Sequence, residues 1–216
     1  MASQAIELMR NAANIKNLAV RGARAEAPVG RPMVKPRRQP LWDTEVLLAA
    51  GTLGINLFVT PQGQQNTAGI AKQAWHTNMT RPGQISSPQT FYLEAISVKV
   101  VPADSVPTQP TAANAVLAFY NAVFKFYVGS KTLLRAPLNK MPGGCGLWDN
   151  SLVTAISFGI PSVHNVFSIK LGGEPYKITA EEHFHAEIQY PTADPGVGVD
   201  TAIQVMLHGV LDDGVA

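Results

Sequence analysis

The chain has 216 residues, enough for one large domain with a substantial core. Apolar residues make up 46% of the sequence and charged residues only 15%, against about 25% charged residues in an average globular domain. A net charge of +2 excludes a chain that binds polyanions over its whole surface, and the single cysteine excludes an internal disulfide framework. A surface with so few charges favours burial against neighbouring subunits.

The charge is unevenly distributed along the chain. Residues 1–40 carry eight basic side chains and two acidic ones, a balance of +6, whereas the remainder has a balance of −4. A basic segment on a mildly acidic body indicates contact with phosphate, either of nucleic acid or of lipid headgroups, and a solvated disordered tail is the alternative. The cations expected to face nucleic acid or a membrane are Arg10, Lys16, Arg21, Arg24, Arg31, Lys35, Arg37 and Arg38.

The same segment predicts a short helix followed by an extended arm. Ser3 can cap a helix over the first twenty residues, in which apolar side chains recur at helical spacing up to Gly22. Four prolines spaced by four residues between positions 28 and 40 then exclude a helix and favour an extended backbone. We therefore expect an N-terminal arm over residues 1–40 and a folded domain over residues 41–216.

After residue 40, strand-like segments alternate with turns rich in glycine and proline. Residues 61–89 have no clear period and predict a long surface loop used in contacts, and residues 111–122 are the best candidate for a helix. Gly129 and Ser130 give a two-residue turn signal, which predicts a hairpin. Strands are predicted over residues 44–50, 55–60, 90–101, 122–129, 131–138, 152–158, 163–171, 183–190 and 201–211.

This series of strands predicts an all-β fold, because it lacks the alternation of strands and helices that is typical of a parallel sheet. We expect an antiparallel sandwich, and within that class a single jelly roll of about eight strands with an extended N-terminal arm beginning in a short helix. The chain contains no internal repeat of about 20–50 residues and is short for two jelly rolls in tandem.

Two histidines one residue apart, in the sequence EEHFHAEIQY, suggest a metal site. On a strand, His183 and His185 share one face with Glu187, and imidazole with carboxylate is suitable ligation for zinc, iron or manganese. The segment resembles the first motif of cupin metalloenzymes, but the carboxylate comes too early and the flanking glycines are missing. His164 or His208 would have to supply a last ligand. The favoured interpretation is a strand with a polar face, without metal or cofactor.

The other candidates for chemistry have simpler structural explanations. Cys145 lies in MPGGCGLWDN, and nothing in the sequence identifies a base that would activate its thiol. The glycines beside it predict a tight loop, because the Gly-Lys-Ser/Thr ending of a phosphate loop is missing. The aromatic residues of FYNAVFKFYVG favour core and interface packing over base stacking, since few basic residues accompany them. We therefore expect no catalytic residue.

Four stretches of the sequence carry a resemblance to a known class of proteins. They are LWDTEVLLAAGTLGINLFV, HTNMTRPGQISSPQTFYLEAISVKVVPAD, VGSKTLLRAPLNKMPGG and IQVMLHGVL. Together they resemble the capsid proteins of tailless icosahedral bacteriophages, including membrane-containing types built from jelly rolls. The resemblance implies a structural role without an active site, assembly into trimers or pseudo-hexameric capsomers, and an arm that faces the capsid interior. The chain is shorter than a tandem double jelly roll, and its DDGVA ending is more acidic than the resemblance to these capsid proteins would lead us to expect.

The sequence therefore predicts a viral structural protein that is not an enzyme and needs no cofactor. We expect a capsid subunit that self-assembles as a homo-oligomer into an icosahedral shell, located in the virion after assembly in the host cytoplasm. Its expected partners are itself, other capsid proteins, and packaged nucleic acid or an internal membrane through the arm. The alternative is a cupin-like metal-dependent enzyme that uses His183, His185 and Glu187. A third hypothesis is a protein that binds single-stranded nucleic acid through its basic tail.

Overall fold

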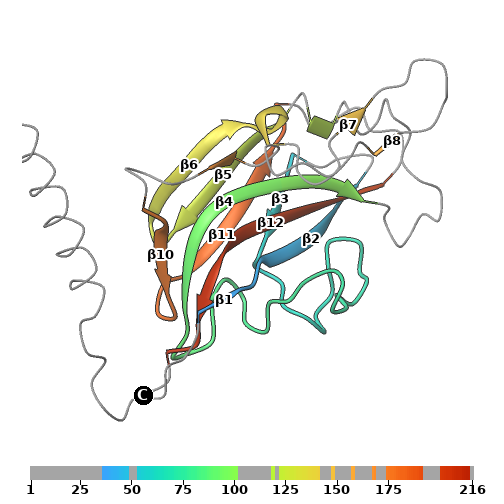
Figure 1. The fold of residues 1–216 in the computed structure, drawn as a ribbon. Coiled ribbons are helices and arrows are strands. Elements are labelled where there is room, and N and C mark those ends of the chain that lie inside the picture. The colour runs from blue at the N-terminus through green and yellow to red at the C-terminus, as the bar shows by residue number, and fades with distance from the viewer. Residues whose placement is uncertain are drawn as a thin grey trace, which may run out of the picture. The chain divides into compact units, whose positions relative to one another are not determined.

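Almost every element of the structure is a strand (Figure 1). In the described part of the chain, helix is limited to residues 118–119 and a 3-10 turn at Leu138–Lys140. None of the helical structure within these bounds is long and apolar enough to cross a membrane. The computed structural model describes residues 36–48, 53–101, 118–119, 122–141, 147–148, 157–158, 167–168, 174–191 and 200–214.

The strands form two antiparallel sheets and a separate pair. In the larger sheet, β12 and β4 lie side by side at the centre, and β1 and β2 follow one another along the other side of β12. The larger sheet contains β1 (Arg37–Arg38), β2 (Leu41–Leu47), β4 (Thr90–Val101), β9 (Phe167–Ser168), β10 (Tyr176–Thr179) and β12 (Thr201–Asp212). The smaller sheet has the order β3 (Gly54–Leu57), β11 (Phe184–Gln189), β5 (Val123–Val128) and β6 (Lys131–Pro137). The separate pair is β7 (Leu147–Trp148) with β8 (Ser157–Phe158).

Alternating side chains from the two sheets form one hydrophobic core. On β11, Phe184, Ala186 and Ile188 are buried while the residues between them are half-buried, and β5 shows the same alternation. The Phe184 ring packs at 5.6 Å from the ring of Phe58 and at 6.2 Å from the ring of Phe126. Because the inward faces of both sheets contribute to this cluster, the arrangement is compatible with a β-sandwich.

A β-bulge in the centre of the larger sheet changes which residues of β4 face the core. The pairing of β4 with β12 shifts register between His208 and Gly209. Before the shift Phe91 and Leu93 belong to the core, and after it Ile96 and then Val98 do, so the alternation slips by one residue. The bulge explains why this strand alternates only in part along its sequence.

Several predicted elements match the structure in position. The segment predicted over 90–101 is β4, and the hairpin predicted around Gly129 and Ser130 is β5 with β6. β3, β11 and β12 also lie within a few residues of their predicted bounds, while β2 begins at Leu41 rather than at residue 44. The strand β10 was not predicted, because four residues are too few to show a period.

The end of the predicted arm is part of the larger sheet. Arg37 and Arg38 form β1 and pair with Leu211 and Val210 of β12, so the larger sheet includes residues before position 41. The extended backbone that the prolines favour is also the backbone of a strand, so it can pair. The predicted helix at the N-terminus, most of the helix predicted over 111–122, Cys145 and His164 lie outside the described residues.

Gly209 provides a test of the bulge. A Cβ at this position would overlap the Tyr92 carbonyl oxygen and stand 2.7 Å from the Phe91 ring, so we expect Gly209→Ala to destabilise the fold. The expected loss is about 1–3 kcal/mol of unfolding free energy, as for other overpacked sites, measured by urea denaturation. Gly69→Asn is the control, since Gly69 has a φ of +78° that asparagine tolerates and open space around it. Equal stability of the two variants would contradict this account of the bulge.

Candidate functional site

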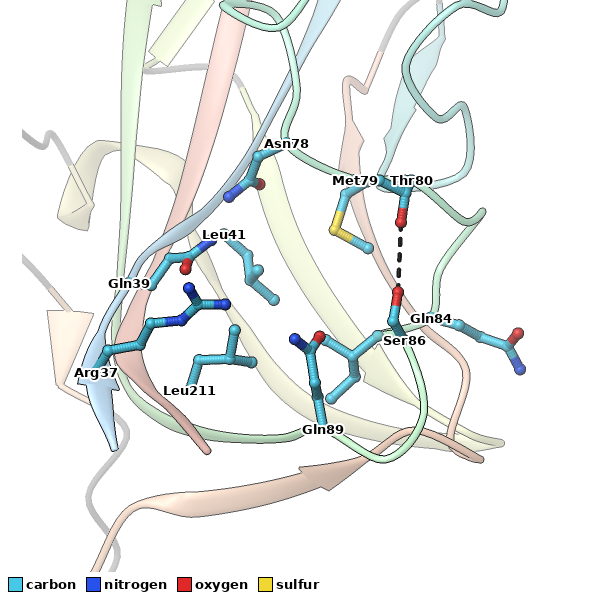
Figure 2. Close-up of a pocket in the computed structure, with 11 residues that line it drawn as sticks. Arg37, Gln39, Leu41, Asn78, Met79, Thr80, Gln84, Ser86, Gln89 and Leu211 are labelled. Carbon is cyan, nitrogen blue, oxygen red and sulfur yellow. Dashed lines mark hydrogen bonds between the residues drawn. The ribbon is translucent and has the colours of Figure 1, made fainter. Parts of the chain in front are cut away.

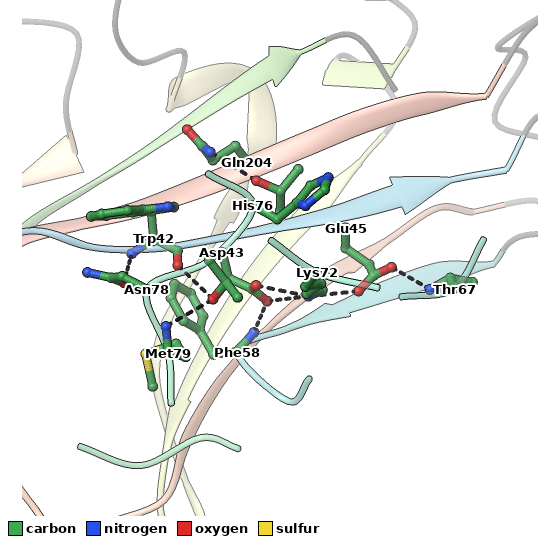
Figure 3. A network of polar contacts seen from close by, with 12 residues as sticks. Trp42, Asp43, Glu45, Phe58, Thr67, Lys72, His76, Asn78, Met79 and Gln204 are labelled. Carbon is green, nitrogen blue, oxygen red and sulfur yellow. Dashed lines mark hydrogen bonds and ion pairs between the residues drawn. The ribbon is translucent and has the colours of Figure 1, made fainter. Parts of the chain in front are cut away.

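A buried cluster of one lysine and two carboxylates joins the long loop to β2 (Figure 3). Asp43 and Glu45 are two residues apart on β2, so their side chains point to the same side of the sheet as Leu41 and Leu47 of the core. Lys72 reaches them from the loop over residues 61–89. The two acidic residues of β2 are therefore inward-facing, and the loop supplies their cation.

The three side chains make short contacts with one another and with the backbone. Lys72 Nζ donates to Asp43 Oδ1 at 2.9 Å and to Oδ2 at 3.0 Å, and it lies 3.0 Å from Glu45 Oε2. The backbone N–H of Phe58 donates to Asp43 Oδ2 at 2.6 Å, and that of Thr67 donates to Glu45 Oε1 at 2.7 Å. The side chains of Lys72 and Asp43 are fully removed from solvent, and that of Glu45 is 3% exposed.

Burial controls the electrostatics of this cluster. Loss of hydration raises the pKa of Asp43, and the Lys72 ammonium and the hydrogen bond from Phe58 act in the opposite direction. One ammonium and two carboxylates carry a net charge of −1 when all three are ionised, which is unfavourable in a site without water. A proton on Asp43 would bring the cluster to neutrality.

The loop also covers the outer edge of β2. Among the described strands, β12 alone pairs with β2, and the other side of β2 meets the loop through an isolated antiparallel bridge between Asp43 and Thr77. Asn78 fills this position: its side chain accepts from the N–H of Trp42 at 2.9 Å and donates to the carbonyl of Pro40 at 2.9 Å. The Thr77 hydroxyl donates to the Trp42 carbonyl at 3.1 Å. The segment after Lys72 is thus fixed along the strand that carries the two carboxylates.

A cavity of about 210 Å³ lies beside this loop, against β1 and the start of β2 (Figure 2). Arg37 is the single cation of its lining, and its guanidinium donates to Asp213 Oδ1 at 3.1 Å, an oxygen that also accepts from the Gln89 side chain at 2.9 Å. Apart from Arg37, the lining residues in the described part of the chain present amides, hydroxyls and apolar groups. The lining residues are Arg37, Gln39, Leu41, Asn78, Met79, Thr80, Gln84, Ile85, Ser86, Gln89 and Leu211.

The histidine and carboxylate of β11 are engaged by the neighbouring strand β5. His185 stacks on Tyr127, with ring centroids 4.6 Å apart and an interplanar angle of 11°. Glu187 accepts a hydrogen bond from the Tyr127 hydroxyl at 3.2 Å and lies 3.5 Å from Lys125 Nζ. The sequence placed His183, His185 and Glu187 on one polar face, and the alternating burial of β11 confirms this for His185 and Glu187. Their contacts are those of a cross-strand polar ladder.

Of the other histidines considered as ligands, His183 lies just before β11 and His208 lies on the other sheet. His183 precedes β11 and hydrogen bonds through Nε2 to the Gln84 side chain at 2.9 Å. His208 is on β12 of the larger sheet, where it bonds Ser97 Oγ at 2.7 Å and burial lowers its pKa. Within the described ranges, no group of three or more His, Cys, Asp or Glu side chains is arranged to hold a metal ion.

Two of the eight cations predicted to face phosphate can be placed. Arg37 and Arg38 are exposed on β1, and Arg37 forms the ion pair with Asp213 described above. Both residues therefore belong to the edge of the larger sheet. The remaining cations, which are Arg10, Lys16, Arg21, Arg24, Arg31 and Lys35, lie outside the described residues.

Sequence reasoning missed the cluster of Lys72, Asp43 and Glu45. A signal for it exists in the sequence LWDTEVL, where the two acidic residues occupy the same alternate positions as Leu41 and Leu47. Carboxylates at the buried positions of a strand predict a buried cation, although they do not say which one.

Comparison of the chain with known proteins gives no relative on which to base a function. No model of a protein family matches the chain, and no curated protein matches it either.

Replacing Lys72 with methionine tests the energetic role of the cluster. The change leaves two carboxylates buried without a cation, and we expect a loss of about 3–5 kcal/mol of unfolding free energy, measured by urea denaturation near neutral pH. Lys125→Met is the matched control, because the Lys125–Glu187 pair is 18% and 25% exposed and such pairs contribute about 1 kcal/mol or less. Similar losses in both variants would show that Lys72 has no special role.

The same variant has an expected pH dependence. Burial holds the pKa of folded Asp43 above the 3.8 of the free side chain, so the stabilisation from protonated Asp43 is complete below about pH 3.8 and is lost as pH rises through the folded-state pKa. Lowering the pH from about 7 to about 5 should therefore restore part of the stability that Lys72→Met loses. Lys125→Met should show no such recovery.

Proposed function

We propose that the chain is a structural subunit of a viral shell, a single jelly roll that self-assembles into an icosahedral capsid with its basic arm toward the interior. The observation that carries this proposal is the separation of charge: residues 1–40 have a balance of +6, although Arg37 and Arg38 lie on β1, and residues 41–216 have a balance of −4 and few charges. A cationic arm neutralises packaged phosphate without reading sequence, while a domain poor in charge packs against copies of itself.

The pairing of the strands supports a jelly roll. The eight principal strands in chain order are β2, β3, β4, β5, β6, β10, β11 and β12. The first of these pairs with the eighth, the second with the seventh, the third with the sixth and the fourth with the fifth. These are the pairings of one long hairpin, and the hairpin is rolled up where β4 joins β12 and β5 joins β11. The resulting two four-strand orders are those expected of two Greek keys.

Exposed apolar side chains support contact between copies. Three large apolar residues of the described part are exposed: Leu53 at 61%, Trp75 at 54% and Val59 at 43%. Leu53 and Val59 flank β3, at one edge of the smaller sheet, and Trp75 is on the loop that covers β2. Aromatic and aliphatic groups at such positions are typical of surfaces that become buried when subunits associate.

Assembly is the direct test of this proposal. The purified full-length chain should form a large symmetric particle, seen by electron microscopy and as a high-mass species in light scattering. Trp75→Ser should lower the assembled fraction. Thr67→Ser changes an exposed residue of the same loop without removing a large apolar side chain, and it serves as the control. A chain that stays monomeric at high concentration, with the arm intact, would contradict a shell subunit.

The arm has its own expected effect. The test variant changes Arg10, Lys16, Arg21, Arg24 and Arg31 to glutamine. It should bind single-stranded nucleic acid more weakly, and its binding constant should fall less steeply with salt concentration, by about 0.7 in the log–log slope per lost phosphate contact. The control changes five exposed cations of the folded domain, Arg81, Lys131, Arg135, Lys140 and Lys177.

Unequal effects of these two sets, with the larger loss in the arm, would support the arm as the phosphate contact. Equal losses would contradict it. The same pair of variants on vesicles of anionic lipid distinguishes a membrane from nucleic acid as the partner, since both present phosphate to the same cations.

A further inference from the structure

The buried cluster places a primary amine against a carboxyl group in a site that excludes water. Lys72 Nζ lies 2.9 Å from one carboxylate oxygen of Asp43 and 3.0 Å from the other, so the carboxyl carbon between them is within reach of the amine. A near-attack arrangement requires reacting atoms about 3–3.5 Å apart with the amine lone pair aligned on the carboxyl carbon, and the contacts at both oxygens hold Nζ beside that carbon. Both side chains are fully buried, which fixes their positions and keeps solvent from competing with the amine.

From this geometry we infer that Lys72 and Asp43 become joined by an amide bond between Nζ and Cγ, formed within the folded chain with Glu45 as proton carrier. The bond is an isopeptide crosslink between the long loop and β2. It is a covalent modification of the chain by itself, and it does not depend on whether the chain assembles into a shell.

The condensation balances without an added reactant. A proton moves from the Lys72 ammonium to Asp43, which gives a neutral amine and a neutral carboxylic acid. The amine lone pair forms the Nζ–Cγ bond, and Glu45 Oε2, 3.0 Å from Nζ, takes the proton that the nitrogen loses. Glu45 passes this proton to the hydroxyl of Asp43, the Cγ–O bond breaks, and one water leaves. No atom is oxidised or reduced.

The contacts around the cluster assign a role to each oxygen. Phe58 N–H donates to Asp43 Oδ2 at 2.6 Å, so it stabilises the negative charge that develops there in the tetrahedral intermediate. Oδ1 is then the oxygen that leaves. On Glu45, Oε1 accepts from the N–H groups of Thr67 at 2.7 Å and of Val46 at 3.2 Å, which leaves Oε2 turned toward Nζ as the proton acceptor.

Burial favours the product over the reactants. An ammonium and a carboxylate both lose hydration in the protein interior, whereas the amide is neutral and the water it releases returns to solvent. Burial also raises the pKa of Asp43 and so favours the acid form that the condensation consumes. Once formed, the bond closes the chain between residues 43 and 72 and reduces the freedom of the unfolded state.

The intact mass of the purified full-length chain, measured after denaturation, tests this inference. The bond predicts a mass lower by one water than the mass of the sequence. Cleavage after glutamate then locates the bond, because Asp43 belongs to the fragment 27–45 and Lys72 to the fragment 46–94. The two fragments should remain joined as one branched product.

Lys72→Arg is the matched control, because arginine keeps a cation between the carboxylates and its guanidinium does not form the amide. This variant should show native circular dichroism, the full mass of its sequence and two separate fragments. Glu45→Gln should lower the fraction of chains that lose water, because glutamine does not take up the proton from Nζ.

The decisive outcome is that of the unchanged chain. A folded chain with the full mass of its sequence would overturn the inference. Loss of one water with fragments 27–45 and 46–94 released separately would overturn it as well, because the dehydration would then lie elsewhere. Assembly has a separate readout, so a negative result here leaves the shell proposal to be judged on its own experiment.

Discussion

When the chain folds, the position of the long loop depends on the need to satisfy a lysine ammonium inside the protein. Lys72 has no exposed side-chain surface, and a buried cation is tolerated only when oxygens replace its lost water. Asp43 and Glu45 provide three such oxygens within 3.0 Å, and they are available only at one position along β2. The loop therefore closes on β2 in a single register, with Asn78 and the residues beside it against the edge of the strand.

Phe58 connects this polar cluster to the hydrophobic core. Its backbone has a φ of +68°, an unusual value for a residue with a side chain, and its N–H donates to Asp43. Its ring is fully buried against Phe184 of β11, and its carbonyl accepts from the N–H of Gly83, whose own carbonyl accepts from Phe184. A strained residue is thus held from both sides, by the carboxylate of the larger sheet and by the aromatic packing of the smaller one.

The sequence predicted the parts of this structure that depend on local pattern. Alternation in HFHAEIQ identified β11 and its polar face, and the glycine turn identified the hairpin of β5 and β6. The residues that contact this face could not be predicted from the sequence, because Tyr127 meets His185 only through the register of β11 with β5. The burial of Lys72 was missed for the same reason, because it depends on a contact between residues that are distant in the sequence. Its partner Asp43 is 29 residues away, and a lysine in a loop without a clear period is expected to be exposed.

A fixed loop matters for the proposed shell because rigid surfaces lose little conformational entropy when they associate. Trp75 lies three residues after Lys72, and its carbonyl accepts from the Gln204 side chain at 3.4 Å, so its exposed ring stands on backbone that is attached on both sides. The loop also covers the edge of β2, which would otherwise be open to pairing with the wrong strand of another copy. By fixing the loop, Lys72 keeps the edge of β2 covered and holds Trp75 in place for the contact between copies that the proposed shell requires.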